Sequence, residues 1–469
     1  MEQNPVISKH IFMFPFTWKS KEHKDNIKKA FESIKVKENS QWERCVLSPS
    51  DDQDADIYNE RNYFYPFTHE TIYDQGNRAS VRHFERKDVE AGLATYVIET
   101  NDKKYELPVE WINLNFYSSG VGILSIFTRN TAYGIEADIL NINQFGRRLY
   151  PPYYSDVSYH SIVAKRLSIE GLAGEYCAEF IEGMAMHNNT QAGFIDKLIC
   201  EASDNICDIK PILDDRMFTM SWYRYGGVDL SDKDAYKGLL EDRSQDFLFK
   251  YIFIDTTDAC CQSDAMYTNL LKDAVYDRWQ GFGTLYGVTR YSLVMLTSEG
   301  CPDFLLKYFE TEYVKMVEIV LVQRASILRL SNTLKASCCD NYNNFRLYYS
   351  EYIEFLSKFR FPDISAQEQA TELYDSLCEK MRIKDNAEHL DNQFNEIQEY
   401  LELNNQRSLN TLAAIAVPVA IVSGFFTFFF HDSYQWGNLP IYRQPEVYWS
   451  LTTLFVTIVV LLIIVRRNR

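Results

Sequence analysis

Histidine is scarce in this sequence, and its cysteines lack the spacing of metal ligands. The eight histidines among 469 residues form no catalytic triad or zinc-binding pattern. The ten cysteines include no pair at the short spacing of zinc sites, and in a reducing compartment they serve as small apolar core residues. We therefore expect no enzyme and no covalent cofactor, and the sequence alone identifies no metal ligand.

Positive charge is also in short supply. Lys and Arg number 48 against 65 Asp and Glu, which gives a net charge of −17. Contact with a nucleic-acid backbone needs clustered positive charge, so we expect no direct nucleic-acid partner. A signal peptide is not expected either, because residues 1–9 are polar and the apolar run 11–18 is short and contains Pro15.

Two long stretches near the C-terminus have no charged residue. Residues 408–430 and 448–465 each have the length and composition of a membrane-spanning helix. The segment between them, 431–447, is too polar for a membrane core and too short for a domain. We therefore expect a membrane hairpin in contact with the lipid bilayer. Two buried core helices are the alternative, but the phenylalanine-rich run 425–430 would need a large partner.

The flanking charges predict how this hairpin is oriented. Arg407 precedes the first span, Arg466 and Arg467 follow the second, and the loop between the spans holds Arg443 and no lysine. Because positive charge stays on the cytoplasmic side, both termini are expected there. The expected location is the inner (cytoplasmic) membrane, crossed more than once.

One face of the first span carries small or weakly polar residues at steps of three and four. Such a face allows close packing between helices, and a ring of such faces is also able to line a narrow pore. The candidate pore-lining residues are Asn410, Ala413, Val417, Ala420, Gly424 and Thr427.

The C-terminal part of the chain resembles the CorA family of divalent-cation channels. The similarity covers about 364–469: an amphipathic acidic helix leads into Leu-Asn-Thr-Leu-Ala-Ala-Ile-Ala-Val-Pro at 409–418, and a second span and a basic tail follow. The resemblance implies a homopentamer with a pore for Mg²⁺ or another divalent cation. The family's Gly-Met-Asn triplet is missing, because Thr427, Phe428 and Phe429 stand in its place. This departure argues against ordinary Mg²⁺ import.

The N-terminal part predicts an α/β domain at 1–302. Runs of β-branched and aromatic residues predict strands at 10–18, 94–100, 111–117, 122–128, 217–225, 248–254 and 291–297. Ser118-Ser119-Gly120 predicts a hairpin turn, and 41–61 has the composition of a loop. Helices are expected at 22–35, 134–150 and 263–278, and residues 151–214 are a candidate added sensor.

A helical stalk is expected at 303–407, followed by the first span at 408–430, the loop at 431–447, and the second span with its tail at 448–469. One helix is predicted over 303–337 and another over 341–359. Ser365 and Glu368 form a capping-box pattern for the next helix, and no Pro or Gly interrupts 365–417, which predicts one continuous rod. The rod carries a coiled-coil seam at Ala387, Leu390, Phe394, Ile397 and Leu401, and its exposed acidic residues are either simply solvated or a divalent-cation sensor.

Two stretches that mix aromatic residues, arginine and glycine are candidates for a ligand site, at 221–227 and 278–291. Arginine binds phosphate and aromatic rings bind flat groups, although the same residues also pack cores, make turns and pair with carboxylates. The glycine spacing at 281–287 is not that of a dinucleotide-binding loop. The candidate ligand-binding residues are Arg147, Arg148, Trp222, Arg224, Arg278, Trp279 and Arg290.

Three functions fit these patterns. The first is a CorA-like channel opened from its cytoplasmic domain. A CorA branch associated with type III CRISPR systems is similar in architecture, and this resemblance implies an antiviral effector gated by a small nucleotide such as an S-adenosylmethionine–AMP conjugate. The second is a housekeeping Mg²⁺ or divalent-cation transporter. The third is a membrane-anchored sensor or scaffold without a pore.

Overall fold

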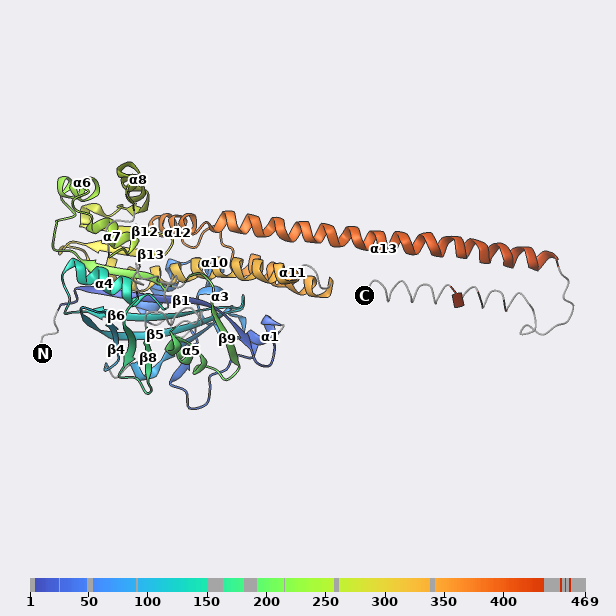
Figure 1. Cartoon of the computed structure of the whole chain (residues 1–469), viewed down its shortest axis with the longest axis horizontal. Coiled ribbons are helices and arrows are strands. Elements are labelled where there is room, and N and C mark those ends of the chain that lie inside the picture. The colour runs from blue at the N-terminus through green and yellow to red at the C-terminus, as the bar shows by residue number, and fades with distance from the viewer. Residues whose placement is uncertain are drawn as a thin grey trace. The chain divides into compact units, whose positions relative to one another are not determined.

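The computed structural model in Figure 1 shows a mixed α/β unit followed by a long helix. It describes residues 5–24, 26–48, 54–89, 92–149, 163–180, 192–214, 216–256, 261–337 and 342–433, together with 448, 452 and 455–456. The chain divides into two compact units, Met1–Glu388 and His389–Arg469. All of the strands among the described residues lie in the first unit.

A sheet of thirteen strands within the described residues organises the first unit, in the order β11-β12-β13-β10-β1-β6-β5-β4-β7-β8. One edge of the long strand β1 pairs with β6, and its other edge pairs first with β10 and then with β9. The long strand β5 likewise pairs on one edge with β4 and then with β3, which carries β2. The strands are β1 (Ser8–Ser20), β2 (Trp42–Arg44), β3 (Val81–Arg86), β4 (Thr95–Glu99), β5 (Lys104–Tyr117), β6 (Val121–Asn130), β7 (Arg166–Glu170), β8 (Tyr176–Glu179), β9 (Ile206–Pro211), β10 (Phe218–Arg224), β11 (Val275–Tyr276), β12 (Thr284–Val288) and β13 (Ser292–Thr297).

Alternating side chains explain why the central strands form a sheet with two covered faces. Phe12, Phe14 and Phe16 of β1 point into a large apolar core with residues of β4, β5 and α5. Gly122 of β6 is required beside them, because a Cβ atom there would lie 2.3 Å from the Phe16 ring. A second core packs β10, β12 and β13 against α4, α6, α7 and α8.

The helix α10 (Glu312–Ser337) packs against β1 and β6 and also contacts α9, α11 and α12. It carries both apolar and charged residues into the interior, among them Glu318 and Arg324. The other helices are α1 (Ile27–Glu32), α2 (Ala55–Tyr63), α3 (His69–Ile72), α4 (Glu136–Gly146), α5 (Gly193–Cys200), α6 (Lys233–Glu241), α7 (Phe247–Phe253), α8 (Asp264–Ala274), α9 (Asp303–Glu310), α11 (Tyr342–Lys358), α12 (Glu368–Lys380) and α13 (Ile383–Ser433).

The structure confirms most of the predicted strands and the turn at Ser118-Ser119-Gly120. The strand predicted at 248–254 is wrong, because this aromatic run forms α7 and buries Leu248, Phe249 and Ile252 as a helix. The loop predicted at 41–61 is also wrong, because this segment contains β2 and most of α2.

Two predictions about the helices are corrected. The helix expected over 303–337 breaks at Thr311, where the backbone has φ −115° and ψ −84°, so α9 and α10 are separate. Ser365 does not cap a helix that begins beside it. Its hydroxyl instead donates to the carbonyl of Tyr63, and α12 begins at Glu368. The expected continuous rod is interrupted before α13, since Arg382 adopts a left-handed φ of 53°.

The prediction of two C-terminal transmembrane helices is not supported. Across the residues that the structure describes, no helix combines the length and apolar composition that a bilayer crossing requires. This finding contradicts the expected transmembrane fold class, the multi-pass membrane location and the ion-channel assignment.

The candidate pore-lining residues lie along α13. The described side chains among them are exposed: Asn410, Ala413, Val417, Ala420 and Gly424. The side chain of Thr427 lies outside the described residues, as do the predicted loop from 434 onward and the second predicted span apart from 448, 452 and 455–456.

Candidate anion-binding site

Two of the predicted ligand-binding residues connect the sheet to α12. The Arg278 guanidinium donates to Glu372 at 2.6 Å and to Glu368 at 2.5 Å. The indole N–H of Trp279 donates to the side chain of Gln369 at 2.5 Å. These contacts hold the segment before β12 against the start of α12. Arg278 and Trp279 therefore have a structural role in joining these two elements.

Three more of the predicted residues have local partners. Trp222 is buried in β10 and donates to the Thr297 hydroxyl at 3.0 Å, while the exposed Arg224 lies 5.4 Å from the Trp222 ring. Arg147 is buried and donates to the Ile254 carbonyl at 3.0 Å, directly after α7. Trp222, Arg224 and Arg147 therefore support the fold at separate places.

Arg290, by contrast, belongs to a group of arginines that the sequence did not predict. We define the arginine cluster as Arg216, Arg290 and Arg324. The guanidinium of Arg216 lies 4.5 Å from the centre of the Tyr291 ring, and that of Arg290 lies 5.9 Å from it. Arg324 is affected electrostatically by both Arg290 and Tyr291.

The fold brings the arginine cluster together from three distant segments. Strands β10 and β13 are parallel, so the residues that precede them, Arg216 and Arg290, lie at the same edge of the sheet. A backbone hydrogen bond of 3.1 Å from Thr219 to Tyr291 fixes this register. Arg324 comes from α10, and the predicted residue Arg148 forms an isolated bridge with Arg216 through the backbone.

Arg324 gives the cluster its unusual electrostatics. Arg324 is only 3% exposed. Among the described residues, it has neither a hydrogen-bond acceptor nor a carboxylate partner. Burial, followed by repulsion from Arg290, lowers the pKa of Arg324 to about 10. Asp214 is the carboxylate that acts on Arg324, but it already binds Arg216 at 2.6 Å. Among the described residues, positive charge therefore exceeds negative charge at this place.

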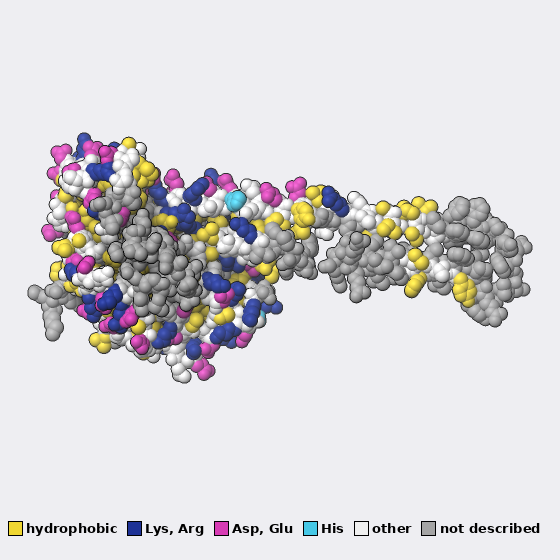
Figure 2. Space-filling view, in the orientation of Figure 1, with side chains coloured by type: hydrophobic (Ala, Val, Ile, Leu, Met, Phe, Trp, Pro, Cys, Tyr) yellow, Lys and Arg dark blue, Asp and Glu magenta, His cyan; other side chains and the backbone are white. Residues whose placement is uncertain are grey.

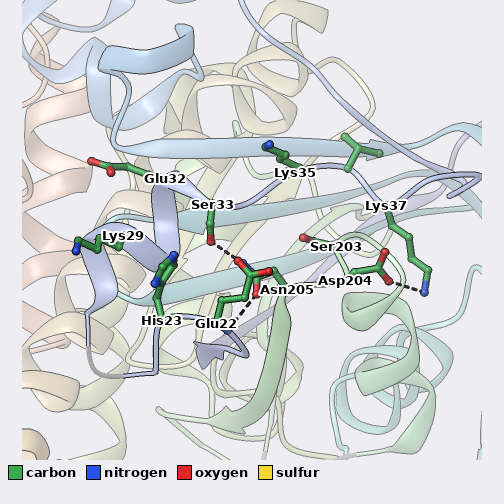
Figure 3. Close-up of a pocket in the computed structure, with 11 residues that line it drawn as sticks. Glu22, His23, Lys29, Glu32, Ser33, Lys35, Lys37, Ser203, Asp204 and Asn205 are labelled. Carbon is green, nitrogen blue, oxygen red and sulfur yellow. Dashed lines mark hydrogen bonds and ion pairs between the residues drawn. The ribbon is translucent and has the colours of Figure 1, made fainter.

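A surface hollow of about 620 Å³ beside α1 is a second place for a ligand, shown in Figure 3. Its lining mixes lysines with carboxylates, and Lys37 pairs with Asp204 at 2.9 Å. Asn205 occupies its centre and binds both Ser33 and Glu22. Three lysines are balanced by three carboxylates in this lining, so the hollow makes a weaker case for an anion than the arginine cluster does.

Apart from a second hollow of about 590 Å³, lined by Arg224, Tyr225 and Glu136 among others, the outer surface of the described residues gives little further indication of a site. On the face drawn in Figure 2, Lys and Arg side chains are interspersed with Asp and Glu over the described part of the first unit. Such mixing is typical of a solvated surface. The signal that could have identified Arg324 from sequence is its position among Val320, Leu321, Val322 and Ile327, where a charge interrupts a buried helix face.

Comparisons with known proteins do not add to this picture. The chain matches no known protein family, no curated protein and no solved structure. The resemblance to the CorA family therefore stays a prediction.

Proposed function

We propose that this protein is a sensor that binds a small phosphorylated ligand at the arginine cluster. The observation that carries the proposal concerns Arg324, which is buried and lies near Arg290. Among the described residues, Arg324 has neither a hydrogen-bond acceptor nor a carboxylate partner. A buried charge is costly unless a counter-charge and hydrogen bonds compensate for it. An anion bound between Arg324 and Arg290 supplies both.

Phosphate is the anion that fits these side chains best. A guanidinium presents paired N–H donors in a plane, and this geometry matches two oxygens of a phosphate group. Burial lowers the effective dielectric constant around Arg324, which strengthens the attraction relative to that of a lysine on the surface. The Tyr291 ring is occupied by Arg216, so it supports the arginines rather than a base.

A nucleotide is the ligand class that we propose. The sequence resemblance points to an adenylate messenger, of which the S-adenosylmethionine–AMP conjugate is one example. The helix α10 is the element that passes the binding event on, because it carries Arg324 and packs against α11 and α12. An anion that neutralises Arg324 removes the unfavourable energy of a buried charge on α10, and so stabilises the packing of α10 against the sheet.

The test is calorimetric titration of the purified full chain with AMP, ATP, inorganic pyrophosphate and the S-adenosylmethionine–AMP conjugate. Arg324→Met and Arg290→Gln should each weaken binding about 10- to 100-fold, because a hydrogen bond to a charged group contributes about 1.5–3 kcal/mol. Binding of pyrophosphate as tight as that of the nucleotides would limit the site to phosphate recognition.

Arg243→Gln is the matched control. Like Arg216, Arg243 lies over a tyrosine ring, that of Tyr267 at 5.3 Å, and pairs with an aspartate, Asp264. It lies outside the arginine cluster, so its removal should leave binding unchanged. The proposal fails if none of the four compounds binds, or if Arg243→Gln weakens binding as much as Arg324→Met.

A further inference from the structure

Strands β2, β3 and β5 carry a set of polar side chains on one face of the sheet. His83 pairs with Asn115, and Glu85 pairs with Asn113, across β3 and β5. The backbone N–H of Cys45, the residue after β2, donates to the His83 carbonyl at 3.0 Å. Side chains alternate along a strand, so all of these residues share one face, while Phe84 and Leu114 between them enter the apolar core.

Three of these side chains converge. A Cys45 sulfur, a His83 ring nitrogen and a Glu85 carboxylate oxygen all lie within 4.8 Å of one another. Sulfur, imidazole nitrogen and carboxylate oxygen are the three ligand types that Zn²⁺ accepts in proteins. At bond lengths of about 2.0–2.3 Å, ligands around a tetrahedral ion are about 3–4 Å apart. Small side-chain rotations are enough to bring the three atoms to that spacing.

The hydrogen bonds behind His83 orient its ring for a metal. Asn115 donates through its amide nitrogen to Glu318 at 3.0 Å, so its oxygen faces His83 Nδ1 at 2.6 Å and accepts a hydrogen bond from the Nδ1–H group. This arrangement leaves the lone pair of Nε2 directed toward Glu85, 2.9 Å away. The Nε2 lone pair and the Glu85 carboxylate repel each other at this distance unless a proton or a cation lies between them. A histidine held through its far nitrogen is typical of metal sites.

A neighbouring side chain supplies an independent observation. The side-chain oxygen of Asn113 is buried, and no described residue donates a hydrogen bond to it. Asn113 is paired with Glu85 in the sheet and shares its face. A buried oxygen without a donor is costly, and a cation or its bound water on this face would satisfy it.

We propose that Cys45, His83 and Glu85 bind a single Zn²⁺-like divalent metal ion. Three protein ligands leave one position of a tetrahedral site for water or for a further oxygen. Glu43 is a candidate for that oxygen, because it is paired with Glu85 on the same face of the sheet. The Asn115–Glu318 pair connects the site to α10, and Lys315 lies 3.8 Å from Glu318 behind it. This site is independent of the arginine cluster.

The experiment is a titration of the metal-free full chain with Co²⁺ and Zn²⁺. Co²⁺ should produce the near-ultraviolet charge-transfer band of a thiolate ligand at one equivalent, and Zn²⁺ should displace it. Cys45→Ser should abolish this band. Cys45→Ser and His83→Gln should each lower the affinity for Zn²⁺ by more than about 10-fold. Losing a residue that only hydrogen-bonds to a metal ligand already costs about 10- to 100-fold.

Two further variants guard against a loss of folding. Glu85 has a side chain that is 48% exposed, so Glu85→Gln should fold normally and still bind Zn²⁺ more weakly. Cys177→Ser is the cysteine control, because Cys177 lies outside the cluster and should leave both the band and the affinity unchanged. The proposal is overturned if the wild-type chain binds no stoichiometric metal, or if Cys45→Ser and Cys177→Ser bind it equally.

Discussion

Arg216 lies over the ring of Tyr291, with its central carbon 4.5 Å from the ring centre, and also binds Asp214 at 2.6 Å. Its charge is therefore compensated before any ligand arrives. The same is not true of Arg324, which is buried and repelled by Arg290. This difference divides the roles within the proposed site: Arg216 is held in place, while Arg290 and Arg324 bind the anion.

Replacing Arg324 with methionine should stabilise the ligand-free protein while removing ligand binding. A buried charge replaced by an apolar side chain of similar length often raises stability, here by about 1–2 kcal/mol. Urea denaturation without ligand measures this effect. Arg329→Met is the comparison on the same helix. Arg329 pairs with Glu351 at 2.8 Å, so its loss should lower stability instead. A lower stability for Arg324→Met would show that Arg324 is already compensated.

The dependence of ligand affinity on salt should differ between the two arginines. Arg290 is exposed, and at physiological salt the screening length is about 8 Å, so its contribution weakens as salt is added. Arg324 is buried and is screened less. Arg290→Gln should therefore flatten the decline of affinity between low and high NaCl, whereas Arg324→Met should lower affinity at every salt concentration. Equal slopes for wild type and Arg290→Gln would count against a contact with Arg290.

Stability should fall as the pH falls through the acid range, in part because of His10. Burial lowers the pKa of His10 to about 4, although its hydrogen bond to Asn143 opposes this shift. Between pH 6.5 and about 4 the unfolded chain binds a proton at His10 that the folded chain does not, so the free energy of unfolding decreases as the pH is lowered. The loss for this one group is about 3 kcal/mol.

Urea denaturation of the wild type and of His10→Gln at pH 7 and pH 4.5 separates this contribution from that of the carboxylates. His10→Gln has no titrating ring, so its stability should change less between the two pH values. Parallel losses in both proteins would assign the acid sensitivity to other groups.

Two glycine-to-alanine changes should have opposite effects. Gly122→Ala places a methyl group 2.3 Å from the Phe16 ring in the core, which should cost about 1–3 kcal/mol of stability. Gly238→Ala lies in α6, where no atom is within 4 Å of the added carbon, and should stabilise by about 0.5–1 kcal/mol through helix propensity. Thermal unfolding of both variants measures the difference, and a neutral Gly122→Ala would contradict the close packing of β6 on β1.

Local pattern determined much of the first unit. Runs of β-branched and aromatic residues are sufficient to identify β1 and the second half of β5, because such side chains suit a buried strand. The same reasoning failed at α7, where an aromatic run is compatible with a strand or a helix and only its burial against β13 decides. It also failed at Ser365, whose partner Tyr63 is 302 residues away in sequence. Hydropathy alone suggested a membrane hairpin, and the described helices do not support it.

Composition and local patterns are enough to predict the α/β character, the deficit of positive charge and one member of the arginine cluster, Arg290. Only the tertiary structure could bring Arg216 and Arg324 to it, because the parallel pairing of β10 with β13 and the packing of α10 join segments that are distant in the chain. The Cys45, His83 and Glu85 group has the same origin. Its ligands follow no spacing rule, since the register between neighbouring strands, rather than a sequence motif, sets the distances between them.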